Sequence, residues 1–347
     1  MRLRYQPKQV LIMMITIWIF AGVMLYSDTA RNVFKFVTES EFFPEDMTND
    51  ILKKSSCNTN LGTFSDVYSN DPPIFENKWG SFGKDHGQFV NPVDITIDSQ
   101  SNVYVIDSDS SLDIHRIQKF SSNGNFISQW KLQDTEDKKI VYFADILIDN
   151  DDNVYVHNNQ NATMQKFTKD GYFIKKWNTS IKENFVGFTI DSFDYTYGLT
   201  DRGAVKKWST DGKLVEEWYL DNYNDVQITN PHDIATDIFD RIYLLDGSRI
   251  HKFDCHGNYL STLSISIPDS FSTIPRDMFI DSSGFIYITS SFQSEILKFS
   301  NDGEFVTKWD SEGSVDGQFS GVGNLVVSSS GQIFVIDPGY DRIQKFI

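Results

Sequence analysis

One short segment recurs six times along this chain and constrains its fold more than any other feature. The letters "RIQKF" at Arg116 return as "TMQKF", "AVKKW", "RIHKF", "EILKF" and again "RIQKF". The aromatic residues that close these segments are Phe120, Phe167, Trp208, Phe253, Phe299 and Phe346. Successive copies are 41 to 47 residues apart, a spacing typical of a repeated structural unit.

Each unit contains four short pieces in the same order. In the first unit they are "NPVDITID" from Asn91, "NVYVID" from Asn102, "HRIQKF" from His115 and "NFISQW" from Asn125. The pieces are rich in β-branched and aromatic residues, and Asn, Asp, Ser or Gly bounds them, which predicts strands. Turns such as "SNG" and "TDG" are typical of tight hairpins. Four strands per unit in six units predict an all-β protein, a six-bladed β-propeller with four-stranded blades.

The sixth unit ends at "RIQKFI" without a fourth strand. The segment "IFENKW" (Ile74–Trp79) stands before the first complete unit and matches the fourth pieces "NFISQW", "YFIKKW" and "EFVTKW". We therefore predict that Ile74–Trp79 pairs with the last blade and closes the ring without the help of a disulfide. This places the propeller domain at 74–347.

The repeated unit resembles the NHL repeat. The resemblance rests on "GQFVNPVDITID", "NVYVIDS" and "HRIQKFSSNGNFISQW" in the first unit, and on "DGQF" from Asp316 followed by "QIFVIDPGYDRIQKF" in the last. It covers about four fifths of the chain, residues 74–347, and it implies a six-bladed NHL-type propeller. NHL propellers bind protein, RNA or small ligands, or catalyse a reaction, so the resemblance leaves the function open.

The N-terminus predicts a membrane segment. Residues 10–26, "VLIMMITIWIFAGVMLY", form a run of 17 without a charge, and three basic residues precede it. A helix of this length reaches about 25 Å, enough for a short span. The basic flank places residues 1–9 in the cytoplasm, and 27–73 becomes a stalk that carries the propeller outside a cell membrane. A signal peptide, cleaved to give a secreted protein, is the alternative.

Charge narrows the choice of partner. The net charge is −17, and it becomes −20 without the first 26 residues. Because nucleic-acid binding depends on Lys and Arg, such a domain is expected to bind RNA or DNA poorly.

The two cysteines, Cys57 and Cys255, form neither a disulfide framework nor a CxxC metal site. The sequons at Asn161 and Asn178 could carry glycans if the propeller is extracytoplasmic.

The start of each first strand carries the candidate binding residues. Aligned there are Asp94, Asp145, Gly187, Asp233, Asp277 and Asn324. If these residues meet at a channel mouth, four carboxylates and an amide could bind a hard cation, such as calcium, or an ammonium group. Alternatively, each Asp accepts hydrogen bonds from backbone amides of its own turn, and we favour this simpler role.

His232 and Arg276 directly precede two of these aligned positions, Asp233 and Asp277. The "NPHDI" around His232 resembles the zinc-binding motif of amidating lyases, which are propellers of related sequence. A catalytic zinc needs about three protein ligands, and none of the other five equivalent positions is His. We therefore expect His232 to be a pocket-rim residue, and the sequence indicates no cofactor.

Each third strand also contains a lysine. The six are Lys119, Lys166, Lys207, Lys252, Lys298 and Lys345. They could form a basic belt for RNA, but the negative charge of the domain favours a packing role inside the blades.

Taken together, the sequence predicts a membrane-anchored extracytoplasmic propeller that binds protein, peptide or glycan. The alternative is a metal-dependent propeller enzyme, lyase-like or lactonase-like, with its site at the channel mouth.

Overall fold

The computed structural model describes residues 71–109, 111–112, 114–132, 145–180, 183–220, 228–265, 275–290, 294–310 and 312–347. The predicted cytoplasmic segment 1–9, the membrane segment 10–26 and all but the last three residues of the stalk 27–73 lie outside these residues. Within the described ranges, no helix is long and apolar enough to cross a membrane. The described residues all belong to one compact unit, 61–347.

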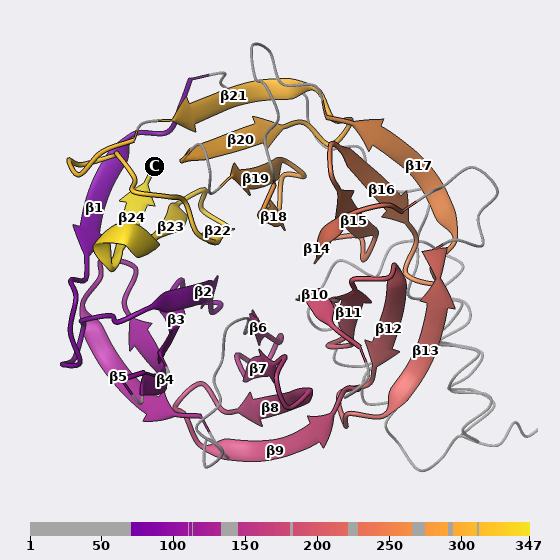
Figure 1. The fold of residues 1–347 in the computed structure, drawn as a ribbon, viewed down its shortest axis with the longest axis horizontal. Coiled ribbons are helices and arrows are strands. Elements are labelled where there is room, and N and C mark those ends of the chain that lie inside the picture. The colour runs from indigo at the N-terminus through magenta and orange to yellow at the C-terminus, as the bar shows by residue number, and fades with distance from the viewer. Residues whose placement is uncertain are drawn as a thin grey trace, which may run out of the picture. The chain divides into compact units, whose positions relative to one another are not determined.

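Six four-stranded antiparallel sheets are arranged in a ring around a central axis (Figure 1). Blades 1 to 3 contain β2 (Pro92–Ile97), β3 (Val103–Asp109), β4 (Ile114–Phe120) and β5 (Phe126–Lys131); β6 (Ile146–Ile148), β7 (Val154–Asn158), β8 (Thr163–Phe167) and β9 (Phe173–Asn178); and β10 (Phe185–Ile190), β11 (Thr196–Thr200), β12 (Ala204–Trp208) and β13 (Leu214–Tyr219). Blades 4 to 6 contain β14 (Pro231–Thr236), β15 (Ile242–Asp246), β16 (Arg249–Phe253) and β17 (Tyr259–Ser264); β18 (Asp277–Ile280), β19 (Ile286–Ser290), β20 (Glu295–Phe299) and β21 (Phe305–Asp310); and β22 (Leu325–Val327), β23 (Ile333–Asp337), β24 (Arg342–Phe346) and β1 (Phe75–Trp79). The predicted all-β, six-bladed architecture is confirmed.

The predicted closure is also confirmed. Strand β1 pairs with β24 in antiparallel register, with Phe75 opposite Phe346 and Trp79 opposite Ile343. Ile74 extends the pairing through two backbone hydrogen bonds with Ile347, of 2.8 and 3.0 Å. Figure 1 shows the indigo strand β1 lying beside the yellow strand β24. The segment that precedes the first unit therefore completes the last blade.

Six hydrophobic clusters hold the ring together, one between each pair of neighbouring blades. Between blades 1 and 2, for example, Tyr104 and Ile106 pack against Val154, Val156 and Phe167. Every residue of β11, β15 and β23 is buried because the middle strands contact a blade on each face. This explains why their sequences lack the apolar and polar alternation of a half-exposed strand.

A tryptophan at the end of most fourth strands packs under a glycine turn of the next blade. Trp79 lies under Gly124, and the same contact joins Trp130 to Gly171, Trp177 to Gly212 and Trp218 to Gly257. A Cβ atom on Gly124 would lie 2.6 Å from the Trp79 ring. The closing strand therefore also provides the packing residue between blades 6 and 1.

The six lysines have the predicted packing role. In blade 1, Asp98 follows the first strand and accepts hydrogen bonds from the amides of Gln100 and Asn102 and from the Tyr104 hydroxyl. Lys119 lies 3.3 Å from the same carboxylate and over the Tyr104 ring. Blades 2 and 3 repeat the Asp, Tyr and Lys arrangement around Asp149 and Asp191. The other three lysines also lie over an aromatic ring of their own blade, Lys252 over Tyr243, Lys298 over Tyr287 and Lys345 over Phe334.

In the sixth blade the lysine has a different carboxylate partner. Ser328 and Phe334 occupy the positions of the Asp and the Tyr, so the turn after β22 offers Lys345 no carboxylate. Its Nζ instead lies 2.7 Å from Oε2 of Glu76 on β1. The closing strand supplies the negative charge that the other blades take from their first turn.

Hydrogen bonds also join neighbouring blades at what we call the turn end, the end that carries the turns between first and second strands. Asp152, Asp194 and Asp240 adopt left-handed backbone conformations with φ of 61° to 65°. Each carboxylate accepts the amide of a residue in the preceding blade, namely Ser99, Asn150 and Ser192 respectively. Blades 5, 6 and 1 have Gly284, Gly331 and Ser101 at this position, so these turn-end bonds join only blades 1 to 4 among the described residues.

Cys255 corrects one expectation of the sequence analysis. It is fully buried in the turn between β16 and β17 and is disulfide-bonded. The sheet closure was expected to stand in place of a disulfide, but the protein has both. Two isolated cysteines carry no spacing pattern that would have indicated the bond.

Candidate functional site

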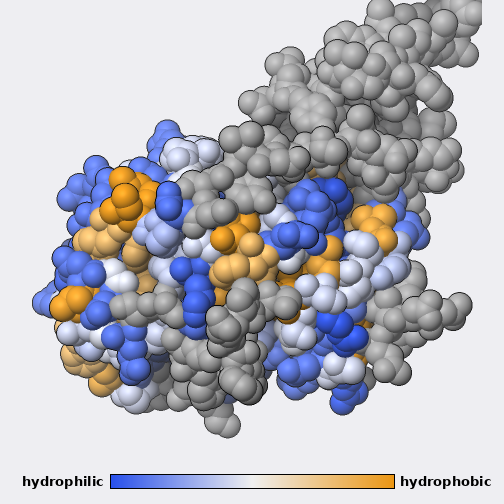
Figure 2. All heavy atoms as spheres, turned by 90° about the horizontal axis from the view of Figure 1, so that it is seen from above, coloured by the Kyte–Doolittle hydropathy of each residue, from blue (hydrophilic) through white to orange (hydrophobic). Residues whose placement is uncertain are grey.

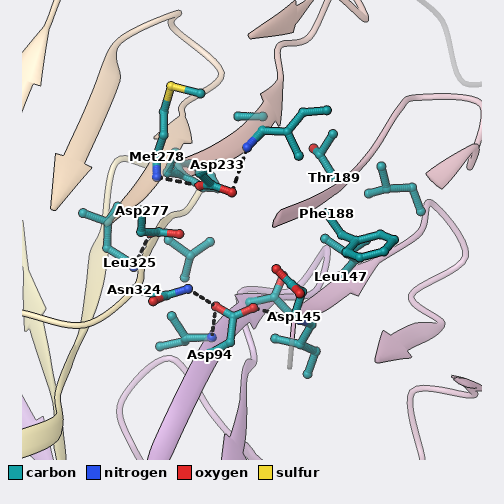
Figure 3. Close-up of a pocket in the computed structure, with 18 of the residues that line it drawn as sticks. Asp94, Asp145, Leu147, Phe188, Thr189, Asp233, Asp277, Met278, Asn324 and Leu325 are labelled. Carbon is teal, nitrogen blue, oxygen red and sulfur yellow. Dashed lines mark hydrogen bonds between the residues drawn. The ribbon is translucent and has the colours of Figure 1, made fainter. Parts of the chain in front are cut away.

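The candidate residues of the first strands surround one central cavity of about 260 Å³. Asp94, Asp145, Asp233, Asp277 and Asn324 all contribute to its lining, and we call these five residues the channel ring. Figure 3 shows their polar groups gathered around the same space, with Leu147, Phe188 and Met278 nearby. The structure therefore brings together five residues that lie up to 230 positions apart in the sequence.

The ring carboxylates bind backbone amides, but mainly those of the next blade. Asp94 accepts the amide of Ile146 at 2.8 Å, and Asp233 accepts the amide of Met278 at 2.7 Å. The same contact runs from Asp145 to the amide of Phe188 and from Asp277 to the amide of Leu325. Asp94 and Asp233 each also accept the amide of the residue that follows them. The favoured turn-capping role is thus incomplete, because the ring also connects blades to one another.

Blades 6 and 3 lack an acidic residue at the aligned position. In blade 6, Asn324 donates its side-chain amide to Asp94 Oδ1 at 2.8 Å, which joins blade 6 to blade 1. In blade 3, Gly187 contributes no side chain to the channel ring, and a Cβ there would lie 2.2 Å from Asp233 Oδ1. Blades 3 and 4 are joined instead by a hydrogen bond between the hydroxyls of Thr189 and Thr236, at 3.0 Å. The sequence revealed the gap at Gly187 but not this substitute contact.

Burial strongly alters the acidity of the ring. Desolvation raises the pKa of Asp94 to about 6 and that of Asp277 to about 7. Desolvation, together with repulsion from Asp94 and Asp277, raises the pKa of Asp145 to about 8. Desolvation and the charge of Asp277 also raise the pKa of Asp233 well above its usual value. At neutral pH the ring therefore carries less negative charge than four ionised carboxylates.

Asp233 and Asp277 interact directly across the boundary between blades 4 and 5. In addition to the effect of burial, the charge of Asp277 raises the pKa of Asp233. Each carboxylate disfavours ionisation of the other, because two like charges repel in a buried site.

His232 and Arg276, which precede Asp233 and Asp277 in the sequence, differ in exposure. His232 is half-buried, its Nε2 lies 2.8 Å from the side-chain nitrogen of Asn230, and burial lowers its pKa. Arg276 is exposed, and its positive charge lowers the pKa of both Asp94 and Asp277. His232 does not belong to the lining of the central cavity, so its rim position stays a prediction, and Arg276 adds one positive charge near the ring.

Across the residues that the structure describes, no three His, Cys, Asp or Glu side chains converge on a point where they could hold a metal ion. In the acidic segment that begins at Asp107, this residue pairs with Arg116 at 2.9 Å. Asp149, in the other acidic turn, pairs with Lys166 at 2.8 Å. These carboxylates serve the fold of their own blades.

Sequence reasoning missed a buried histidine next to the ring. His157 on β7 is fully buried, its ring lies 4.0 Å from that of Phe188, and its Nε2 lies 2.9 Å from the Thr179 hydroxyl. Burial lowers the pKa of His157 to about 3, so the imidazole is neutral. Hydrophobic residues stand at most equivalent positions, and this exception was the signal that could have identified it.

The two sequons lie at one corner of blade 2. Asn178 is exposed at the end of β9, and Asn161 is half-buried in the turn before β8. Thr163, the hydroxyl residue of the first sequon, lies opposite Asn178 in the strand register. The structure brings the two sequons together but gives them different surroundings.

Comparison with known proteins links the chain to NHL repeats. No protein-family model matches it. It is 27% identical over 163 residues to NHL repeat-containing protein 3 of Homo sapiens, covering 41% of this chain and 47% of that protein. It is 26% identical over 121 residues to Protein brain tumor of Drosophila melanogaster, covering 34% of this chain and 11% of that protein. The match thus spans less than half the length of either relative.

Solved structures share the fold at low sequence identity. A streptogramin B lyase superimposes with a TM-score of 0.56 at 10% identity, over 78% of this chain and 96% of that one. A protein of unknown function from Bacteroides thetaiotaomicron gives a TM-score of 0.57 at 13% identity, over 77% and 74%. These likenesses concern the fold alone. Together with the repeat pattern, the NHL relatives and the six closed blades, they lead to one assignment: the chain is an NHL-type six-bladed β-propeller.

Proposed function

We propose that this protein is a membrane-anchored, extracytoplasmic binding module whose propeller takes a protein, peptide or glycan ligand at the channel ring. The observation that carries the proposal is the central cavity of about 260 Å³, whose polar lining comes from five different blades. Concave sites with a few convergent polar groups in an otherwise apolar lining are typical binding sites.

The charge of the site favours a ligand with a cationic group. The net charge of −20 beyond residue 26 favours the approach of positive ligands. The four acidic ring residues are partly protonated at neutral pH, and a bound cation would lower the pKa of the carboxyl beside it and keep that carboxyl ionised. An ammonium group could donate hydrogen bonds to Asp145, which remains half-buried rather than fully enclosed. Arg276 could bind a neighbouring carboxylate or carbonyl of the same ligand.

Two observations support the extracytoplasmic location. The apolar run 10–26 with its basic flank is typical of an anchor that leaves the following domain outside. The disulfide at Cys255 is typical of proteins in oxidising compartments. The outer side of the ring that Figure 2 shows intersperses hydrophilic and hydrophobic residues. We assign membrane attachment to residues 10–26.

The binding proposal can be tested with the full chain in lipid nanodiscs and a displayed library of peptides. Peptides with a free amine should be enriched by the native protein, and Asp145→Asn should reduce that enrichment about tenfold, which corresponds to about 1.4 kcal/mol of binding free energy. Asp170→Asn, in an outer turn, is the matched control and should not change enrichment. Equal enrichment by all three proteins would count against the channel ring as the site.

The location needs its own experiment. The full chain should stay with membranes after alkaline extraction and react with a membrane-impermeant amine reagent on intact cells. Mass analysis of its N-terminus separates the retained anchor from the cleaved signal peptide. A chain that is released at high pH and protected from the reagent would refute the proposed location.

A further inference from the structure

We propose that Asn178 is an N-glycosylation site of this protein and that the neighbouring sequon at Asn161 is left unmodified. This inference depends on the extracytoplasmic location proposed above, because only that location exposes the chain to the glycosylation machinery. The two sequons have equivalent patterns in sequence, and the structure distinguishes them.

The surroundings of Asn178 permit a bulky attachment. Asn178 is the last residue of the outer strand β9, its side chain is exposed, and β9 forms the outer edge of its sheet. The middle residue of its sequon is held in place, since the Thr179 amide donates to the Ala162 carbonyl at 2.8 Å and the Thr179 hydroxyl contacts His157. A glycan on Asn178 therefore extends from an outer edge without disturbing these contacts.

Asn161 has different surroundings. Its side chain is half-buried, and its Oδ1 accepts a hydrogen bond from the hydroxyl of Thr163, which is only 5% exposed. The backbone amide of Asn161 contacts Oδ1 of Asn158, and Ala162 adopts a left-handed conformation with φ of 51°. A sugar on the Asn161 amide would have to leave this enclosed turn, so a chain glycosylated there would lose part of its β7 to β8 connection.

The strand register strengthens the distinction. Thr163 lies directly opposite Asn178, so the acceptor of one sequon and the hydroxyl residue of the other are cross-strand neighbours. Neighbours in an antiparallel pair have Cβ atoms about 5 Å apart. The two sequons therefore share one folded corner, in which Asn178 is the exposed acceptor and Asn161 the half-buried one.

The modification is a group transfer from a polyprenyl-diphosphate-linked oligosaccharide. The Nδ2 atom of Asn178 forms a bond with the anomeric carbon of the first sugar, and the bond between that carbon and the phosphate oxygen breaks. The amide loses one proton, and the polyprenyl diphosphate leaves. The transferase of the secretory pathway supplies the catalyst, and the propeller supplies only the acceptor.

The test expresses the full chain in cells that perform N-glycosylation and measures its mass before and after enzymatic removal of N-glycans. We expect one glycan on the native protein and on Asn161→Gln, and none on Asn178→Gln or Ser180→Ala. Two glycans on the native protein, or loss of the glycan in Asn161→Gln, would overturn the inference.

A designed sequon separates failure of this inference from failure of the location. Asn125→Thr creates an acceptor at Asn123, which is exposed in the turn before β5. If Asn123 is modified in this variant while Asn178 is not, the inference is wrong and the extracytoplasmic location stands. If neither residue is modified, the proposed location fails, and the inference fails with it.

Discussion

Lys345 on β24 and Glu76 on β1 form an ion pair of 2.7 Å that joins the strand completing the ring to the blade it completes. Lys345 is almost fully buried, whereas the Glu76 side chain is 39% exposed. The pair replaces the Asp and Tyr partners that lysines have in the other blades. The Glu76 carboxylate is therefore expected to contribute more to the stability of the fold than the carboxylate of an exposed ion pair.

The first prediction concerns this pair. Glu76→Gln leaves a buried ammonium without a counter-charge and should lower the free energy of unfolding by about 1 to 2 kcal/mol. Asp316→Asn is the matched control, because it removes the partner of Lys78 in an exposed pair. The control should change stability by less than about 0.5 kcal/mol. Urea denaturation followed by tryptophan fluorescence measures both, and equal losses would contradict the special role of Glu76.

Removal of the closing strand should have a larger effect. Deletion of residues 74–79 opens the sheet of blade 6 and removes Trp79 from under Gly124. We expect loss of the single cooperative unfolding transition, because both faces of the gap between blades 6 and 1 become exposed to water. Circular dichroism during thermal unfolding tests this, and an unchanged transition would show that the ring does not need β1.

Alanine substitutions at two glycines can distinguish the cost of backbone strain from the cost of a packing clash. Gly124 and Gly331 have almost the same φ, 80° and 85°, but only Gly124 has a tryptophan ring against it. Gly331→Ala should cost about 1 kcal/mol, the strain of a left-handed alanine. Gly124→Ala should cost about 2 kcal/mol more because its Cβ overlaps Trp79. Similar losses in the two variants would mean that Trp79 moves aside easily.

The channel ring predicts a pH dependence of stability. Asp94, Asp277 and Asp145 have folded pKa values of about 6, 7 and 8, above the ordinary 3.8. Their protonated forms are favoured in the folded state, so their contribution to stability is complete below pH 4 and is lost as the pH rises through 6 to 8. Stability from this source should therefore fall between pH 5 and pH 8.5.

Asp145→Asn tests this pH dependence directly. The amide keeps an oxygen to accept the Phe188 amide and cannot ionise, and Asn324 shows that an amide is accommodated in the ring. The variant should be about 1 to 2 kcal/mol more stable than the native protein at pH 8.5 and equal to it at pH 4. Denaturation at both pH values measures the difference. A constant difference would assign the effect to packing rather than to ionisation.

The disulfide at Cys255 gives a further prediction. The sequence contains one other cysteine, Cys57, so we expect these two residues to be bonded within one chain. Reduction should lower the melting temperature, and non-reducing electrophoresis should show a faster band than the reduced protein. Cys255→Ser should remove that difference. A disulfide-linked dimer under non-reducing conditions would show that the bond joins two chains.

The blade count and the closing strand could be predicted from sequence because the repeat fixes four strands per unit and leaves Ile74–Trp79 unmatched. The packing role of the lysines followed from their position within the third strands. The channel ring positions also followed from alignment of the units, but their partners did not. A side chain that binds the next blade, as Asp94 binds the Ile146 amide, leaves no local pattern in the sequence.

Other features could not be found for related reasons. The bond of Cys255 joins positions with no spacing signature, and the hydroxyl pair of Thr189 and Thr236 consists of ordinary strand residues. The raised pKa values of the ring depend on burial and on neighbouring charges that exist only after the blades assemble. The predicted anchor 10–26 lies outside the described residues and stays a prediction.

The pairing of β1 with β24 also determines the order of folding. During synthesis β1 emerges before every other blade strand, yet its partner emerges after all of them. Contacts between residues this far apart in sequence form slowly, because a long loop must close first. Until then β1 and the incomplete sixth blade present unpaired strand edges to other chains. The step that makes the ring complete is therefore also the step during which a newly made chain is most exposed to aggregation.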